Sequence, residues 1–113
     1  MKFSLDEVLK PLPGPATPQE PHGVWYAQPF KYGSMRLVAY APKIADTQTP
    51  HKQDELYFVM RGSGDFILEN YRRPCAAGDA LFVPAYKVHR FENFSDDFAV
   101  WAVFWGPPGG ESA

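Results

Sequence analysis

Between residues 24 and 105, short apolar segments alternate with turn-forming residues, and no helical periodicity interrupts them. Segments of this length that are rich in β-branched and aromatic residues are typical of β-strands. The predicted strands are residues 24–26, 34–41, 54–60, 65–69, 80–83, 89–92 and 98–105. The turns between them are marked by residue types that tolerate positive φ, namely Gly62, Gly64, Asn70 and Gly78. The pattern predicts an all-β fold.

Length and charge narrow the class of protein. With 113 residues, 45% of them hydrophobic, the chain has room for one domain with one core. The net charge of -2 is nearly balanced, and basic residues are scattered apart from Arg72 and Arg73, which disfavours nucleic acid and anionic membranes as partners. No apolar stretch approaches the roughly 20 residues of a transmembrane helix. Asp6 and Glu7 do not suit a secretion signal, and the lone Cys75 cannot form an intramolecular disulfide, so we expect a cytoplasmic protein.

Residues 1–23 differ in kind from the rest of the chain. Ser4 and Glu7 have the spacing of a capping box, which predicts a short helix over about residues 5–10. The prolines within residues 11–21 lack backbone donors and favour an extended spacer. Two interpretations stay open: a disordered leader, or a segment that docks on its own β-domain or on a neighbouring subunit through Phe3, Leu5, Val8 and Leu9.

The C-terminal stretch GPPGGESA has almost nothing to bury, so we expect it to be flexible. The predicted organisation is therefore an N-terminal helix and proline-rich arm at residues 1–23, a barrel at residues 24–105, and a flexible tail at residues 106–113.

The predicted strand at residues 98–105 is apolar on both faces. One face carries Phe98, Val100, Ala102 and Phe104, and the other carries Ala99, Trp101, Val103 and Trp105. A strand on the outside of a lone small barrel should be polar on its outer face, so another surface should cover this one. Dimerisation is the simplest cover, and we predict a homodimer.

Two histidines and a glutamate stand out inside the β-rich segments. His51 and Glu55 belong to one such segment and His89 to another. Side chains two and four residues apart on an extended strand project from the same face, so His51, Gln53 and Glu55 would share one. Two imidazoles and one carboxylate are a common facial ligand group for a divalent transition metal with open coordination positions. Because burying Glu55 without a counter-charge is costly, a cation or hydrogen-bond donors should lie beside it.

The order of residues around these three resembles that of the cupin superfamily, which are small jelly-roll metal barrels. The first cupin signature contains a glycine, two histidines, a glutamate and a closing glycine, and its last three members correspond to His51, Glu55 and Gly62. The second signature is matched at Gly78, Pro84, His89 and Asn93. The resemblance covers roughly residues 34–105 and implies a double-stranded β-helix, or jelly-roll barrel, with a metal at its centre.

Three signature positions depart from the family pattern. Lys43 replaces the opening glycine, Thr49 replaces the first histidine, and Tyr86 replaces the internal glycine of the second signature. The loss of that histidine removes one ligand of the set that the resemblance implies, and Gln53 is the nearest same-face residue that could substitute weakly. Mixed imidazole and carboxylate ligation suits iron, manganese, nickel or zinc.

Two aromatic residues are expected to line the cavity around the metal. Tyr57 and Phe91 share strand parity with Glu55 and His89, so their side chains should face the same interior, either as plain core or as walls that contact a substrate. A metal in this place would act as a Lewis acid or an oxygen platform, and Glu55 could double as a catalytic base.

Two hypotheses of function from different classes fit these residues. The first is an enzyme that oxidises, cyclises or isomerises an oxygenated aromatic or polyketide-like small molecule. It rests on the open metal site and on a similarity to small bacterial cupins linked to aromatic polyketide synthesis of the tetracenomycin type. The second is a non-catalytic small-molecule binder or assembly subunit with a weak or vestigial metal site, which Thr49 favours.

Overall fold

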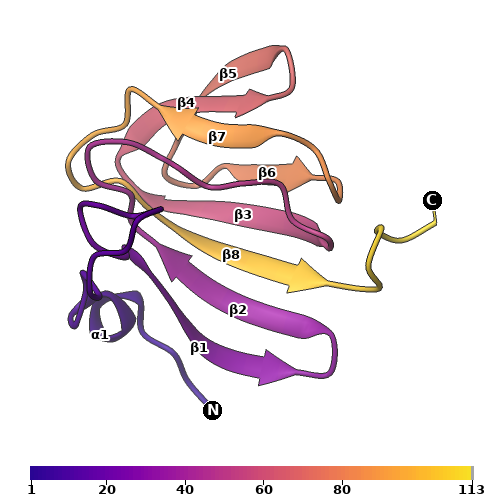
Figure 1. Cartoon of the computed structure of the whole chain (residues 1–113), viewed down its shortest axis with the longest axis horizontal. Helices are drawn as coiled ribbons and strands as arrows, with labels where there is room; N and C mark the ends of the chain where they lie inside the picture. Colours follow the sequence, from indigo (N-terminus) through magenta and orange to yellow (C-terminus); the bar gives the residue numbers. More distant parts are fainter. Residues whose placement is uncertain (113) are drawn as a thin grey trace.

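Eight strands form two antiparallel sheets in the computed structural model of the chain, which describes residues 1–112 (Figure 1). One short helix, α1 (Leu5–Leu9), precedes them. The strands are β1 (Tyr26–Tyr32), β2 (Met35–Tyr40), β3 (Asp54–Arg61), β4 (Ser63–Leu68), β5 (Tyr71–Ala76), β6 (Ala80–Val83), β7 (His89–Glu92) and β8 (Ala99–Trp105). The predicted all-β jelly-roll class is confirmed.

The two sheets divide the chain unevenly. The larger sheet has the strand order β1-β2-β8-β3-β6, and the smaller has the order β5-β4-β7. The last strand, β8, lies between β2 and β3, so the middle of the larger sheet is assembled from segments far apart in sequence. Such a crossover brings residues of β2, β8 and β3 into one row.

The core lies between the inward faces of the two sheets. Along β3, Tyr57 and Val59 are buried while Phe58 and Met60 on the opposite face are 40% and 45% exposed, as the two-residue period of a strand requires. The ring centroids of Tyr57 and Phe91 are 5.0 Å apart, and those of Phe91 and Phe98 are 4.9 Å apart. These edge-on aromatic contacts join the larger sheet to the smaller one.

Six of the seven predicted strands are present, whereas the predicted strand at residues 24–26 shares only Tyr26 with β1, and β5 was not predicted. Strand β5 was missed because its side chains are mostly exposed and Pro74 interrupts the apolar pattern. Strand β1 begins at Tyr26, where the predicted strand ends, and runs on through Pro29, with a register shift between Ala27 and Phe30. Proline is tolerated on edge strands and at bulges, where a missing donor breaks no ladder bond.

The outer face of the larger sheet is apolar across several strands. Val103 of β8 pairs with Leu37 of β2 and with Leu56 of β3, and Leu56 pairs in turn with Phe82 of β6. Phe82 is 49% exposed. The two-sided apolar character predicted for β8 is therefore present. The homodimer that was to cover this face stays a prediction.

The N-terminal helix packs against its own barrel, which favours the docked alternative. The Phe3 ring lies 5.2 Å from the Phe30 ring of β1, and Asp6 forms an ion pair with Arg61 of β3. The predicted helix is present, but the predicted capping box is wrong because the Ser4 side chain makes no capping hydrogen bond. Packing and the ion pair hold the helix in place instead.

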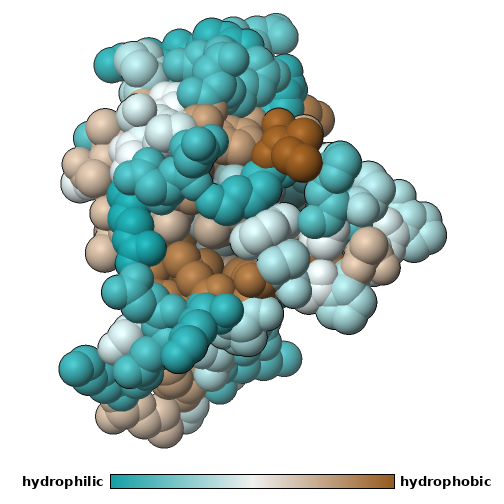
Figure 2. All heavy atoms as spheres, turned by 90° about the vertical axis from the view of Figure 1, so that its left-hand side faces the viewer, coloured by the Kyte–Doolittle hydropathy of each residue, from teal (hydrophilic) through white to brown (hydrophobic). Residues whose placement is uncertain are grey.

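The proline-rich arm folds back, contrary to the extended spacer predicted from its prolines. Gly14 and Val24 form a β-bridge, with backbone N···O distances of 2.7 and 3.1 Å, and Thr17 and Glu20 exchange two backbone hydrogen bonds between them. Residues between the prolines keep their N–H donors, and these bonds close the turn. Figure 2 looks onto the side of the molecule where the arm and the β7–β8 loop lie, and shows apolar patches between hydrophilic segments.

The C-terminal segment after β8 makes defined contacts where flexibility was expected. The backbone N–H of Gly109 donates to the Lys52 carbonyl at 2.7 Å, and that of Glu111 donates to Asp54 Oδ2 at 2.9 Å. Ala113 lies outside the described residues. Within residues 1–112, no helix has the length and apolar character needed to span a membrane.

Candidate metal centre

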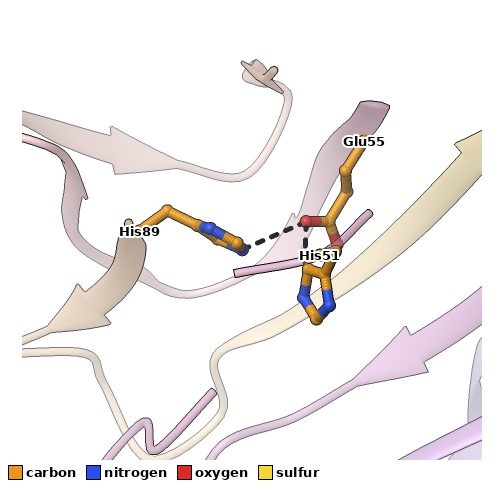
Figure 3. A group of neighbouring side chains, drawn as sticks. All are labelled: His51, Glu55 and His89. Carbon is orange, nitrogen blue, oxygen red and sulfur yellow. Dashed lines mark ion pairs between the residues drawn. The ribbon is translucent and has the colours of Figure 1, made fainter. Parts of the chain in front are cut away.

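The three predicted ligands come together from both sheets (Figure 3). Glu55 lies on β3 and projects inward, beside Phe104 of β8 and Val83 of β6 in the strand register. His89 is the first residue of β7, in the smaller sheet. His51 lies in the loop before β3, and its carbonyl accepts a 2.7 Å hydrogen bond from the Tyr86 backbone N–H.

The geometry places one carboxylate oxygen between two imidazoles. Glu55 Oε1 lies 3.2 Å from His89 Nε2 and 3.9 Å from His51 Nε2. One potential ligand atom from each of the three residues lies within 4.8 Å of the others. Glu55 and His89 are each 2% exposed, and the His51 side chain is 30% exposed. The cluster is therefore closed on one side and open on the His51 side.

A hydrogen bond to the backbone sets the tautomer of His89, and with it the nitrogen that turns a lone pair toward Glu55. His89 Nδ1 lies 2.8 Å from the Lys87 carbonyl oxygen, which can only accept, so Nδ1 carries the proton in the neutral ring. Nε2 is then an acceptor that points at the acceptor Glu55 Oε1. Both atoms are buried, and neither has a hydrogen-bond partner within the described part of the chain.

Two buried acceptors that face each other require a positive centre between them. Buried polar atoms are nearly always satisfied, and an orphaned pair is a common sign of an ion or proton that belongs there. The donor set of His51, Glu55 and His89 fits a divalent transition metal, with Nδ1 of His89 anchored in the way typical of metal-ligating histidines. The residues present thus fit the metal that the sequence predicts.

Burial shifts the pKa values of the cluster. Burial lowers the pKa of His51 to about 4, with contributions from the nearby His89 and Arg36, so this imidazole is neutral at pH 7 and ready to ligate. Burial raises the pKa of Glu55 against the opposing effect of His89. Burial also lowers the pKa of His89, but the neighbouring Glu55 carboxylate and the Lys87 carbonyl outweigh it, and the net shift is upward. Without metal, Glu55 and His89 together therefore tend to hold a proton.

A loop network that the sequence analysis missed supports the cluster. Gln48 Oε1 accepts a 2.9 Å hydrogen bond from the Tyr57 hydroxyl and lies 3.3 Å from His51 Nε2. The Gln48 amide nitrogen donates to Asp46 Oδ2 at 2.6 Å, and that oxygen also accepts from the Phe91 backbone N–H at 2.8 Å. These residues stand in a loop without strand periodicity, so no sequence signal marked them.

Gln53, predicted as a weak fourth ligand, does not join the cluster in the structure. Its amide nitrogen donates to the carbonyls of Ser34 at 2.8 Å and Gly106 at 3.0 Å, and its Oε1 accepts from Arg36. The prediction assumed an extended strand from residue 51 onward, but β3 begins only at Asp54. The two-residue alternation of strand side chains therefore does not apply to residues 51–53. The side-chain amide that lies beside the cluster is that of Gln48.

The two predicted aromatic wall residues lie at different depths. Tyr57 lines a cavity of about 340 Å³ that also contains His51 and Glu55. Phe91 is 1% exposed and lies beneath Tyr57 as part of the core, not among the lining residues. Phe104 and Arg36 also line the cavity, and no local sequence pattern marks either of them as a site residue.

The sequence profile of the Cupin domain matches residues 36–105, which is most of the chain, and this chain belongs to the cupin family. It is 37% identical over 75 residues to an uncharacterized protein of Streptomyces coelicolor, covering 66% of this chain and 70% of that protein. It is 38% identical over 64 residues to acireductone dioxygenase 1 of Pectobacterium atrosepticum, covering 52% of this chain but only 37% of that enzyme.

The fold matches solved cupins as well. A cupin 2 conserved barrel domain protein from Salinispora arenicola superposes with a TM-score of 0.61 at 23% identity, covering 72% of this chain and 74% of that one. At this identity the likeness concerns the fold. The jelly-roll barrel implied by the two signatures is thus confirmed.

Proposed function

We propose that this cupin binds a divalent transition metal through His51, Glu55 and His89 and acts there on an oxygenated small molecule. The observation that carries the proposal is the buried, facing pair of acceptors, Glu55 Oε1 and His89 Nε2. Glu55 also lines a cavity of about 340 Å³, together with the third candidate ligand, His51. A bound divalent ion would supply a Lewis acid, with iron, manganese, nickel and zinc all suited to these ligands.

The chain's own residues have separate roles in this proposal. Glu55 and His89 hold a proton in common without metal, so metal binding would release that proton to solvent and metal loss would take one up again. Within a reaction, the same carboxylate could accept a proton from a substrate in the cavity. Tyr57 and Phe104 provide apolar walls, which favour planar substrates such as oxygenated ring compounds of the polyketide type.

Metal content tests the proposal directly. Protein purified without added metal is analysed for metals, and stripped protein is then titrated with iron(II), manganese, nickel and zinc while its thermal stability is recorded. We expect about one ion per chain, and no binding after His89→Ala. His22→Ala is the matched control, because His22 lies in the arm outside the cluster and should leave loading unchanged. A wild-type protein that stays empty with all four metals would overturn the proposal.

A non-catalytic binder is the second candidate, favoured by Thr49 at the position of the first cupin histidine. Thr49 lines the cavity but cannot supply an imidazole. The two candidates are separated by turnover: a metal-loaded protein that binds a chelating ligand without changing it is a binder. The proposed homodimer is compatible with both, because the apolar outer sheet face lies on the side of the larger sheet opposite the cavity.

A further inference from the structure

One row of side chains crosses the larger sheet from Arg36 to the candidate metal centre. In the strand register, Arg36 of β2 pairs with Phe104 of β8, and Phe104 pairs with Glu55 of β3. Residues in one row project from the same face of the sheet. Neighbouring strands are about 4.8 Å apart, so the backbones of Arg36 and Glu55 are separated by about 10 Å. Arg36 is thus the interior residue two strands away from the metal-ligand carboxylate.

Phe104 is the surface shared by the guanidinium and the metal centre. Arg36 Cζ lies 4.3 Å from the centroid of the Phe104 ring, and the His51 ring meets the same ring edge-on with centroids 4.9 Å apart. A guanidinium over an aromatic face is held by a cation–π interaction, which fixes the plane in which its donors lie. A ligand lying along Phe104 would therefore touch Arg36 at one end and the His51 side of the centre at the other.

The outer nitrogens of Arg36 have no partner within residues 1–112. Its Nε donates to Gln53 Oε1 at 3.1 Å, and the amide of Gln53 is itself anchored to two backbone carbonyls. No carboxylate of the described chain pairs with Arg36, whereas Arg61 and Arg90 each pair with one and Arg72 pairs with two. The Gln53 anchor therefore positions the arginine and leaves both Nη groups free.

The charges of the cavity-lining residues make Arg36 the candidate anion-binding residue. Arg36 is the sole arginine or lysine among the cavity-lining residues of the described chain. Glu20 of the arm also lines the cavity, and its carboxylate accepts a 2.9 Å hydrogen bond from Thr47. Glu55, the other carboxyl of the lining, belongs to the candidate metal centre. Away from that centre an anionic group is repelled by Glu20 and attracted by Arg36, which favours one orientation of an anionic ligand.

We propose that Arg36 is a specificity residue that binds a substrate carboxylate, so that the natural substrate is an oxygenated carboxylic acid. The planar fork of Nη donors matches a carboxylate bidentately. A hydroxyl, enol or keto oxygen of the same molecule then lies at the His51, Glu55 and His89 centre, with Phe104 beneath the part between. This inference rests on the proposed function and narrows its substrate class.

A matched pair of probes tests the inference in the metal-loaded protein. Catechol and 3,4-dihydroxybenzoate share the same chelating oxygens and differ by one carboxylate, and calorimetric titration gives the Kd of each. We expect wild-type protein to bind the carboxylated probe at least about tenfold more tightly, which is the scale of one charge-assisted hydrogen-bonded pair. Arg36→Gln should bring the ratio of the two Kd values close to one. Arg36→Lys should give an intermediate ratio, since it keeps the charge and loses the fork.

Arg73→Gln is the matched control, because Arg73 lies exposed on β5 outside the cavity and should leave the ratio at the wild-type value. Equal binding of both probes by wild-type protein, or a preference that survives Arg36→Gln, would overturn the inference and leave the metal-site function standing. If neither probe binds a protein that has been shown to hold metal, the substrate-binding function fails together with the inference. Should Arg36→Gln not fold, the wild-type ratio and Arg36→Lys decide the question.

Discussion

Replacing Glu55 with glutamine should stabilise the metal-free protein and remove its response to metal. Glu55 is 2% exposed, and its Oε1 faces an acceptor without a hydrogen-bond partner in residues 1–112. A buried unsatisfied polar group costs about 1–3 kcal/mol. Glutamine keeps the shape of the side chain, carries no charge, and can donate an amide N–H to His89 Nε2. At pH 8, where the proton that Glu55 and His89 hold in common is lost, metal-free Glu55→Gln should therefore exceed wild type by about 1–3 kcal/mol in unfolding free energy.

The stability advantage of metal-free Glu55→Gln over wild type should grow with pH. Burial raises the pKa of Glu55, so the wild-type protein has its full stability below the ordinary glutamate pKa and loses part of it as pH rises through the value in the folded state. Glutamine does not titrate and avoids this loss. His89, whose net pKa shift is also upward, changes wild-type stability in the same direction, so the difference between the two proteins should be small near pH 4.5 and large near pH 8.

Metal should reverse the order of stability. At a free-metal concentration about 100 times Kd, a single site stabilises the folded state by about 2.7 kcal/mol. The wild-type protein should gain this amount, while Glu55→Gln, which lacks the carboxylate ligand, should gain little. A change of 1 kcal/mol moves Tm by about 4 °C in a domain of this size, so both effects are measurable by thermal melts with and without metal.

Glu69→Gln is the control for the loss of one carboxylate. The Glu69 side chain is 49% exposed, and its ion pair with Lys87 is long, at 4.0 Å, so the pair contributes little to stability. It should change stability by less than about 0.5 kcal/mol with or without metal. The reasoning is refuted if metal-free Glu55→Gln is less stable than wild type at pH 8, which would mean that the ionised carboxylate is satisfied in the folded state. An unchanged metal response in Glu55→Gln would show that Glu55 is not a ligand.

Further predictions concern the loop, the thiol and the outer face. Gln48→Ala should weaken metal binding more than Gln53→Ala in the same titration, because only Gln48 contacts His51. Tyr86→Gly should raise the unfolding free energy by about 1 kcal/mol in urea titrations, since Tyr86 has φ 68 and is 56% exposed, whereas Tyr86→Ala should not. Burial, aided by Asp79, raises the pKa of Cys75 to about 11, so Ellman's reagent should not label it at pH 8 until the protein unfolds. Sedimentation should give twice the 12.7 kDa chain mass, and Phe58→Lys on the outer face should give the monomer. A wild-type monomer would exclude the dimer.

Strand identity followed from the sequence wherever one face of a strand is buried. In β3 the alternation of Tyr57 and Val59 with Phe58 and Met60 indicates both the strand and its inward face. That signal is absent where a strand lies at the edge of a sheet and faces water. For this reason β5, whose side chains are mostly exposed, and most of β1 escaped prediction.

The ligand residues were predictable because their chemistry is unusual in a strand and their spacing is local or belongs to a known signature. Glu55 and His89 are polar residues beside apolar strand residues, His51 precedes Glu55 by four positions, and the structure brings all three together. A sequence cannot say which turn of a loop approaches them. Gln53 was predicted beside the cluster because the two-residue alternation of a strand was extended to residues before the start of β3 at Asp54, whereas the structure places Gln48 there.

The remaining features of the site depend on contacts between segments far apart in the chain. The crossover that inserts β8 between β2 and β3 puts Arg36 in one row with Phe104 and Glu55. No local pattern contains that register, because it arises only when separate strands pair. The sequence by itself determined the barrel and its three candidate ligand residues, through local periodicity and residue chemistry. Tertiary structure alone decided which loop amide, which arginine and which aromatic ring surround them, because long-range strand pairing sets those distances.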